Sequence, residues 1–117
     1  MLRLRLFLAL LIAGSLTLPL QAATITVADD GADYTSIQAA VDAAVSGQDE
    51  VVVSPGTYLE AINFNGKAIT LRSQSGDPTD TIIDGTGSSH VVQCISGEGA
   101  GTVLEGFTIT GGNANGN

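Results

Sequence analysis

The fold is decided by residues 50–85, which read EVVVSPGTYLEAINFNGKAITLRSQSGDPTDTIIDG. In this stretch, short runs rich in β-branched residues alternate with Pro-Gly, Asn-Gly, Asp-Pro and Asp-Gly pairs. The runs favour strands, and the pairs favour turns because Gly and Asn tolerate a positive φ while Pro fixes its own. The pattern continues beyond residue 85 and predicts short strands within residues 51–53, 61–64, 69–71, 81–83, 91–94 and 103–110.

The spacing of these runs separates two all-β architectures. Several short strands are typical of an antiparallel sandwich or barrel, and also of a parallel solenoid, in which each strand stacks on its counterpart one coil later. Val52 and Thr70 lie 18 residues apart, Thr70 and Val92 lie 22 apart, and Ile62 and Ile82 lie 20 apart. Coils of about 20 residues are in the range of solenoid repeats, so the spacing favours the parallel solenoid.

A different pattern precedes these runs. The alternation of residues 24–27 predicts a short strand, and the acidic, glycine-containing segment 29–33 predicts a turn. A helix is predicted from Thr35 to Ser46, with Thr35 and Gln38 spaced as a capping box and Gly47 as its stop. An amphipathic helix at this place would cover the exposed end of the first coil. Its expected apolar face consists of Ile37, Ala40, Val41, Ala44 and Val45.

Several of these segments resemble the opening of pectin-lyase-like right-handed β-helix proteins. The resemblance is carried by DYTSIQAAVDAA at residues 33–44, VVVSPGTYLE at 51–60, TIIDG at 81–85 and EGFTITGG at 105–112. Pectin methylesterases and secreted β-helix repeat proteins begin in a similar way. The resemblance implies an all-β, right-handed parallel β-helix (solenoid) with an N-terminal capping α-helix.

The same resemblance bears on where a catalytic site would lie. In this family the catalytic residues, such as the paired aspartates of the pectin methylesterases with their glutamine and arginine partners, belong to later coils, and their motifs do not occur here. Because the sequence ends just after a strand without a cap, we interpret it as incomplete at the C-terminus. The expected organisation is a signal peptide at 1–22, a strand and capping helix at 23–49, and the first coils of the β-helix at 50–117.

The N-terminal segment has the layout of a secretory signal peptide. Two arginines precede an apolar run at residues 6–20, and small residues follow, so we expect cleavage after Ala22. The run is short for a membrane span, which needs about 20 residues. The mature protein is therefore expected to be secreted, to the extracellular space, the cell surface or the periplasm, without membrane insertion.

The charge of the mature chain limits the kinds of molecule that it is expected to bind, and its cysteine content excludes an internal disulfide. After cleavage two basic and twelve acidic residues remain, so the formal net charge is −10. A chain this acidic is not expected to bind nucleic acid, whose recognition requires basic side chains. Cys94, the single cysteine, allows no internal disulfide and is predicted to be a small buried side chain. With no tryptophan in the chain, the core is predicted to be aliphatic.

Few residues stand out as candidate functional groups. Each acidic cluster has a simpler explanation in turn formation, and neither has the alternating ligands of a calcium loop, so no cofactor is expected and Ca²⁺ is the only cation considered. His90 lies in a predicted surface turn beside Ser88 and Ser89, and Lys67 and Arg72 could meet an acidic sugar or be solvated edge charges. The acidic clusters are Asp29, Asp30 and Asp33, and Asp77, Asp80 and Asp84.

We therefore predict the N-terminal part of a secreted right-handed β-helix repeat protein that is associated with polysaccharide, with no catalytic, cofactor-binding or metal-binding residue in these 117 positions. Two alternatives stay open: the N-terminal part of a pectinesterase or polysaccharide lyase, and a non-catalytic surface or adhesion protein. Whether the full-length protein is an enzyme depends on sequence beyond Asn117. An uncapped last coil would also favour self-association.

Overall fold

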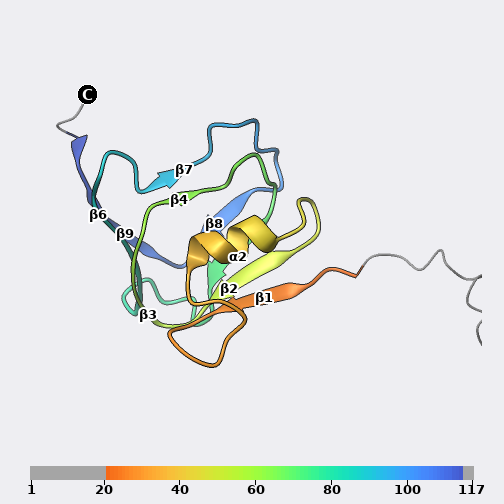
Figure 1. Cartoon of the computed structure of the whole chain (residues 1–117), viewed down its shortest axis with the longest axis horizontal. Helices are drawn as coiled ribbons and strands as arrows, with labels where there is room; N and C mark the ends of the chain where they lie inside the picture. Colours follow the sequence, from red (N-terminus) through yellow and green to blue (C-terminus); the bar gives the residue numbers. More distant parts are fainter. Residues whose placement is uncertain (1–20, 115–117) are drawn as a thin grey trace, which may run out of the picture.

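A computed structural model describes residues 21–114 (Figure 1). These residues form short strands joined by loops and one α-helix, α2 (Ile37–Ala43). The predicted signal peptide therefore lies outside the described residues, apart from Gln21 and Ala22. The strands are β1 (Thr24–Val27), β2 (Glu50–Val53), β3 (Gly56–Leu59), β4 (Ile62–Asn63), β5 (Thr70–Ser73), β6 (Thr81–Ser88), β7 (Val92–Gln93), β8 (Val103–Glu105) and β9 (Thr108–Gly112).

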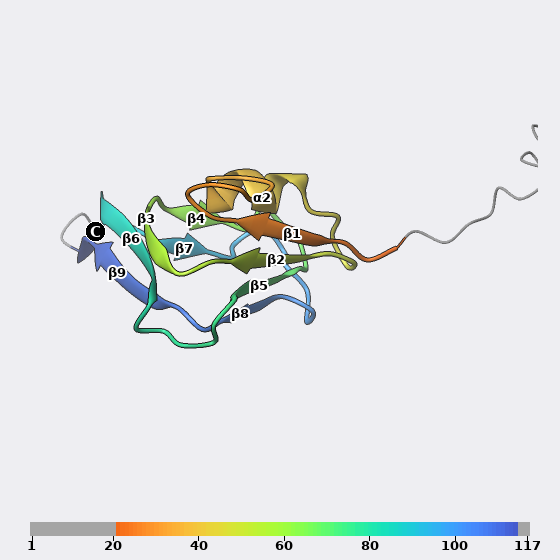
Figure 2. The ribbon, with the colours of Figure 1, turned by 90° about the horizontal axis from the view of Figure 1, so that it is seen from below.

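The strands form three sheets in which all neighbours are parallel. Their orders are β1-β2-β5-β8, β3-β6-β9 and β4-β7. From β2 onward the chain visits the three sheets in rotation, and each strand pairs with its counterpart from the previous passage. Figure 2 shows β1, β2, β5 and β8 stacked in this order, with α2 at the β1 end. The prediction of an all-β protein built from parallel strands is confirmed to this extent.

The lengths of the passages differ from the prediction. Only the step from β2 to β5, in which Glu50 pairs with Thr70, has the expected length of about 20 residues. Thr70 pairs next with Val103, not with Val92, which pairs instead with Ile62. The spacings from Thr70 to Val92 and from Ile62 to Ile82, from which the coil length was predicted, therefore do not connect paired residues, because loops of unequal length separate the strands. Spacing measured across such loops does not give the register.

Three predicted turns and strands also need correction. A turn was predicted at residues 55–58, but Gly56–Leu59 forms β3, which pairs with β6, and buried Tyr58 donates its hydroxyl to the Ser54 carbonyl at 2.8 Å. The expected turn at residues 84–85 lies inside β6. The run at 103–110 is divided between β8 and β9 at Gly106, whose φ of +86° ends the first strand.

Gly106 also has no room for a side chain. A Cβ there would lie 2.3 Å from Oγ of Ser73 in the strand below. Glycine is therefore required by both conformation and packing at this bend between two sheets.

The core lies between the three sheets and beneath α2, and it is mainly aliphatic, as predicted. Side chains in register on successive strands stack on one another, as Val51 and Leu71 do, and both are fully buried. Burying a side chain of this size contributes about 1.5–3 kcal/mol. Aromatic rings add to this at Tyr58 and Phe64. The other large buried hydrophobic side chains are Val27, Ile37, Val41, Val53, Ile62, Ile69 and Ile83.

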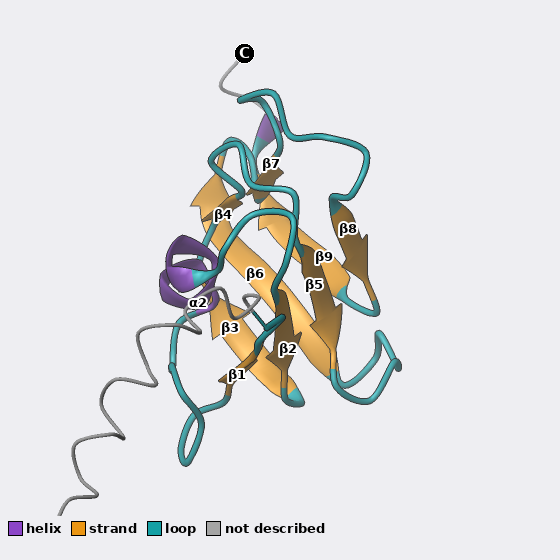
Figure 3. Cartoon of the chain, turned by 90° about the vertical axis from the view of Figure 1, so that its right-hand side faces the viewer, coloured by secondary structure: helices purple, strands orange, loops and turns teal. Residues whose placement is uncertain are grey.

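The two ends of the stack differ. At one end α2 packs beside β1, and Figure 3 shows the helix nearly along its axis. At the other end β8 and β9 are the last strands of their sheets among residues 21–114. Their side chains Val103, Leu104 and Ile109 remain 36–42% exposed. Apolar side chains on outermost strands leave this end uncovered in the described part of the chain.

Candidate functional site

The first turn of α2 is held by its N-cap residue and by hydrogen bonds to β4. Ser36 is the N-cap, and its Oγ accepts from the Ala39 amide at 3.2 Å. The predicted capping box of Thr35 and Gln38 is therefore wrong, because the helix begins one residue later than that box requires. Gln38 instead exchanges two hydrogen bonds with the backbone of Asn63, at 2.9 and 2.7 Å, which ties α2 to β4.

Glu60, between β3 and β4, supplies a carboxylate to the same helix end. It accepts hydrogen bonds from Ser36 Oγ at 3.0 Å, from the Ile37 amide at 2.8 Å and from the Gln38 amide at 3.0 Å. The first amides of a helix have no partner within it, and the helix dipole favours a negative charge there. Glu60 satisfies both needs from a residue more than 20 positions away.

Lys67, between β4 and β5, performs the opposite function at the helix C-terminus. Its Nζ donates to the carbonyls of Val41 at 3.0 Å and Ala44 at 2.8 Å, and also to that of Asp42. A cation at this end is favoured by the same dipole. We call Glu60 and Lys67 together the helix clamp. Lys67 is thus neither a free ligand for an acidic sugar nor a solvated edge charge.

Arg72, the other predicted candidate for an acidic ligand, lies on the outer face of the four-stranded sheet. Its Nε lies 3.2 Å from Oε1 of Glu50, and both side chains are about one-third exposed. An exposed pair of this kind adds little stability. In register, Arg72 aligns with Thr26 and Val52 on one side and with Glu105 on the other. The row Thr26-Val52-Arg72-Glu105, which we call the polar row, is polar at three of its four positions and is interrupted by Val52, an apolar side chain that is only 8% exposed.

In the first acidic cluster, the Asp33 carboxylate is used within the loop that follows β1. Asp33 accepts hydrogen bonds from the amide and the hydroxyl of Thr26 at 3.0 and 3.2 Å, so its carboxylate closes the loop after β1. Asp29 and Asp30 are not brought together with it into a ligand set. Within residues 21–114 no three His, Cys, Asp or Glu side chains are grouped so as to hold a metal ion.

The second acidic cluster is similarly used in turns. Asp77 accepts from the Thr79 hydroxyl at 2.7 Å and its amide at 2.9 Å, and these bonds, the hydroxyl first, lower the pKa of the Asp77 carboxyl. Asp80 accepts from Ser75 and Thr81, each at 2.7 Å. Asp84 accepts a hydrogen bond from the Thr86 amide at 2.8 Å. Each carboxylate of this cluster therefore makes its own local contacts.

Neither Cys94 nor His90 is part of a nucleophilic site among the described residues. Cys94 is exposed, so the prediction that it is buried is wrong: β7 ends at Gln93 before the alternation reaches it. Partial desolvation and then the Glu98 carboxylate raise the pKa of the Cys94 thiol, which disfavours the reactive thiolate. His90 is exposed between β6 and β7, next to Ser89.

Glu98 is a structural residue that sequence reasoning missed. Its carboxylate accepts from the Gly66 amide at 2.7 Å and the Ser96 amide at 2.9 Å, so it joins the loops that follow β4 and β7. These amides, Gly66 first, lower the pKa of the Glu98 carboxyl. No local signal could reveal this contact, because 32 residues separate Glu98 from Gly66.

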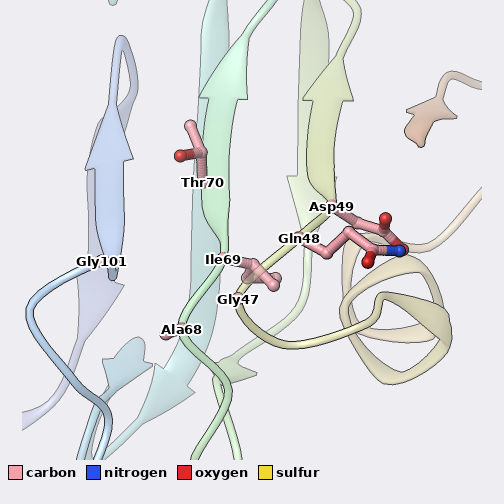
Figure 4. Close-up of a pocket in the computed structure, with 7 residues that line it drawn as sticks. All are labelled: Gly47, Gln48, Asp49, Ala68, Ile69, Thr70 and Gly101. Carbon is pink, nitrogen blue, oxygen red and sulfur yellow. The ribbon is translucent and has the colours of Figure 1, made fainter. Parts of the chain in front are cut away.

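Asp49, in the loop before β2, was also missed. It is 7% exposed, and its two carboxylate oxygens accept from the Val45 amide at 2.8 Å and the Ala23 amide at 2.9 Å. These amides, Val45 first, lower the pKa of the Asp49 carboxyl. Asp49 also lines a pocket of about 180 Å³ (Figure 4). The pocket residues are Gly47, Gln48, Asp49, Ala68, Ile69, Thr70 and Gly101.

The pocket is smaller than ordinary small-molecule sites, which occupy about 300–1,000 Å³. The geometry of residues 21–114 thus provides clamps and turns, and one accessible polar row. No described helix is both long and apolar enough to cross a bilayer. No protein-family model, curated protein or solved structure matches the chain. What the fold itself defines is an all-β protein of parallel sheets with one clamped helix.

Proposed function

We propose that the chain is the N-terminal, closed end of a secreted right-handed parallel β-helix protein, released by cleavage after Ala22. The observation that carries this proposal is the rotation of the chain through three parallel sheets, with α2 at only one end of the stack. In a solenoid, terminal repeats need such a cover, because an exposed apolar end invites association. The primary function of these residues is then architectural.

The helix clamp supports a capping function for α2. A seven-residue helix is too short to be stable alone, since isolated helices need about 12–15 residues. Glu60 and Lys67 neutralise its two ends from the loops that flank β4. The lid is therefore fixed to the passage that it covers.

The exposed end supports continuation of the β-helix. Val103, Leu104 and Ile109 would be covered by a further passage of chain, or by a second copy. In water this end favours self-association of the 117-residue chain through β8 and β9.

For the whole protein we propose association with polysaccharide, without a catalytic site in these residues. The polar row on the outer face of the four-stranded sheet supports this proposal, because a β-helix extends such a row along its length as a polymer does. Arg72 is paired with Glu50 and aligned with Glu105, so the row carries more negative than positive charge and favours a neutral polymer over an acidic one.

Three measurements test these proposals: circular dichroism, affinity electrophoresis and an assay of pectin turnover. Circular dichroism of the purified chain should show mainly β structure with a small helical part, and a predominantly helical spectrum would remove the fold proposal. Affinity electrophoresis in gels containing pectin or a neutral glucan should retard the chain, and Arg72→Ala should reduce the retardation while Lys67→Ala should not. Equal mobility with and without polymer would refute polysaccharide binding, and turnover of pectin would refute the absence of a catalytic site.

A further inference from the structure

Asp49 is only 7% exposed, and a local turn accounts for just one of its two carboxylate oxygens. One of its oxygens closes the turn after α2 through the Val45 amide. The other is directed to the backbone nitrogen of Ala23, 26 residues earlier, at 2.9 Å. Ala23 is the residue immediately after the expected cleavage point.

The position of Ala23 is fixed from the side of the mature protein. Its carbonyl accepts from the Glu50 amide at 3.0 Å, which starts the pairing of β1 with β2. Its nitrogen is thus held by Asp49 and its carbonyl by Glu50, one residue further along. The preceding residues add one described bond, from the Gln48 side chain to the Gln21 carbonyl at 3.1 Å.

We infer that Asp49 is the binding site for the α-ammonium group of Ala23 that signal cleavage creates. Hydrolysis of the Ala22–Ala23 bond adds one water: Ala22 leaves with a carboxylate, and the new amine of Ala23 takes a proton. The amide hydrogen bond of the precursor then becomes an ion pair with the same carboxylate. This inference rests on the proposed secretion and cleavage.

The access of the processing enzyme and the surrounding charges agree with this assignment. Gln21, Ala22 and Ala23 are exposed and lie outside regular structure, as the substrate of a peptidase must. Lys67 is the cation whose field reaches Asp49, and the Glu50 carboxylate lies at the neighbouring residue. The Glu50 carboxylate is itself paired with Arg72, so Asp49 is the carboxylate that would bind the new amine.

The consequence is that maturation fastens the first strand. In the precursor, β1 is held at this point by a neutral donor, and in the mature chain by a charged donor. Both bonds use the ionised Asp49 carboxylate, and the ammonium adds an attraction between two full opposite charges. The outermost strand of the four-stranded sheet, beside the helix lid, becomes more firmly attached only after the leader is removed.

The first test identifies the mature N-terminus of the secreted protein by intact mass and N-terminal sequencing. We expect the chain to begin at Ala23. A different first residue would overturn this inference, and an uncleaved leader would overturn the proposed processing as well.

The second test measures the pKa of the terminal amine in chains that begin at Ala23, from the pH dependence of the ¹³C shift of Ala23. An opposite charge at hydrogen-bond distance should raise this pKa by about one unit above that of the Asp49→Asn variant, a tenfold change in acid dissociation. Asp30→Asn, which removes an exposed charge elsewhere, should leave it unchanged.

A chain extended by one residue, beginning at Ala22, keeps Asp49 intact and so controls for misfolding of the Asp49→Asn variant. Its amine is displaced from the carboxylate and should titrate at its ordinary value of about 7.7–8.0. Equal amine pKa values in the Ala23, Ala22 and Asp49→Asn chains would overturn the ion pair while leaving secretion and cleavage intact.

Discussion

Glu60→Ala tests whether the helix lid depends on a carboxylate supplied by a distant segment. The change removes three hydrogen bonds at the start of α2, among them those from the Ile37 and Gln38 amides. Ile37 is fully buried, so its amide has little access to replacement water. Ser36 still caps the Ala39 amide in the variant.

The expected cost follows from these contacts. Loss of a helix cap costs about 0.5–2 kcal/mol, and loss of a hydrogen bond to a charged group about 1.5–3 kcal/mol. Because Glu60 is partly exposed, water can restore some of this, and we expect a loss of about 2 kcal/mol. For a domain of this size that lowers the melting temperature by about 8–16 °C.

The assay is urea unfolding followed by circular dichroism, with Glu60→Gln and Glu105→Ala measured in parallel. Glu60→Gln keeps the shape and one accepting oxygen and should lose about half as much stability as Glu60→Ala, in keeping with the loss of charge alone. Glu105→Ala removes an exposed carboxylate on β8 and should stay within about 0.5 kcal/mol of the wild type. If Glu60→Ala behaves like Glu105→Ala, the clamp does not stabilise the lid.

Three further perturbations follow from the same structure. Gly111→Ala should unfold at a lower urea concentration than Gly97→Ala: both glycines have a positive φ, but only at Gly111 would a Cβ collide, 2.0 Å from Oδ1 of Asp84. Lys67→Met should lower the free energy of unfolding by about 1 kcal/mol and reduce its dependence on salt, because a cation leaves the helix C-terminus. Since the pKa of Glu98 is lowered from its usual 4.5, its contribution is present above that pH and lost as pH falls through the folded-state pKa, so Glu98→Gln should flatten the acid limb of a stability–pH curve.

The sequence allowed most of the strands to be located, because most of them contain a local run of β-branched residues; β3, with the sequence GTYL, is the exception. The span of β1 agrees with the prediction, and β2, β5 and β7 overlap their predicted runs. The helix was also found, although it is shorter than the predicted Thr35–Ser46 and Val45 is 48% exposed. The helix ends at Ala43, because the backbone of the C-cap residue Ala44 is extended, with a ψ of 146°.

The register of the strands and the partners of the charged side chains could not be predicted from local sequence patterns. The step from Thr70 to Val103 contains β6, β7 and the loop that follows, and nothing in the local pattern sets the length of that loop. Glu60 and Lys67 look like ordinary surface charges until the fold brings them to the two ends of α2. The turn at Asp77 was correctly predicted, because its hydrogen bond to Thr79 depends only on a residue two positions away. The turn predicted at Asp84 was not, since the strand β6 continues through it.

The central claim is that successive strands stack in parallel as the chain passes repeatedly through three sheets. Interstrand nuclear Overhauser effects in the isotope-labelled chain test it most directly. We predict backbone amide-to-Hα contacts in parallel register between Glu50 and Thr70, between Thr70 and Val103, and between Ile62 and Val92. Strong Hα–Hα contacts between these strands, which mark antiparallel pairing, or contacts that place Val92 beside Thr70, would contradict it.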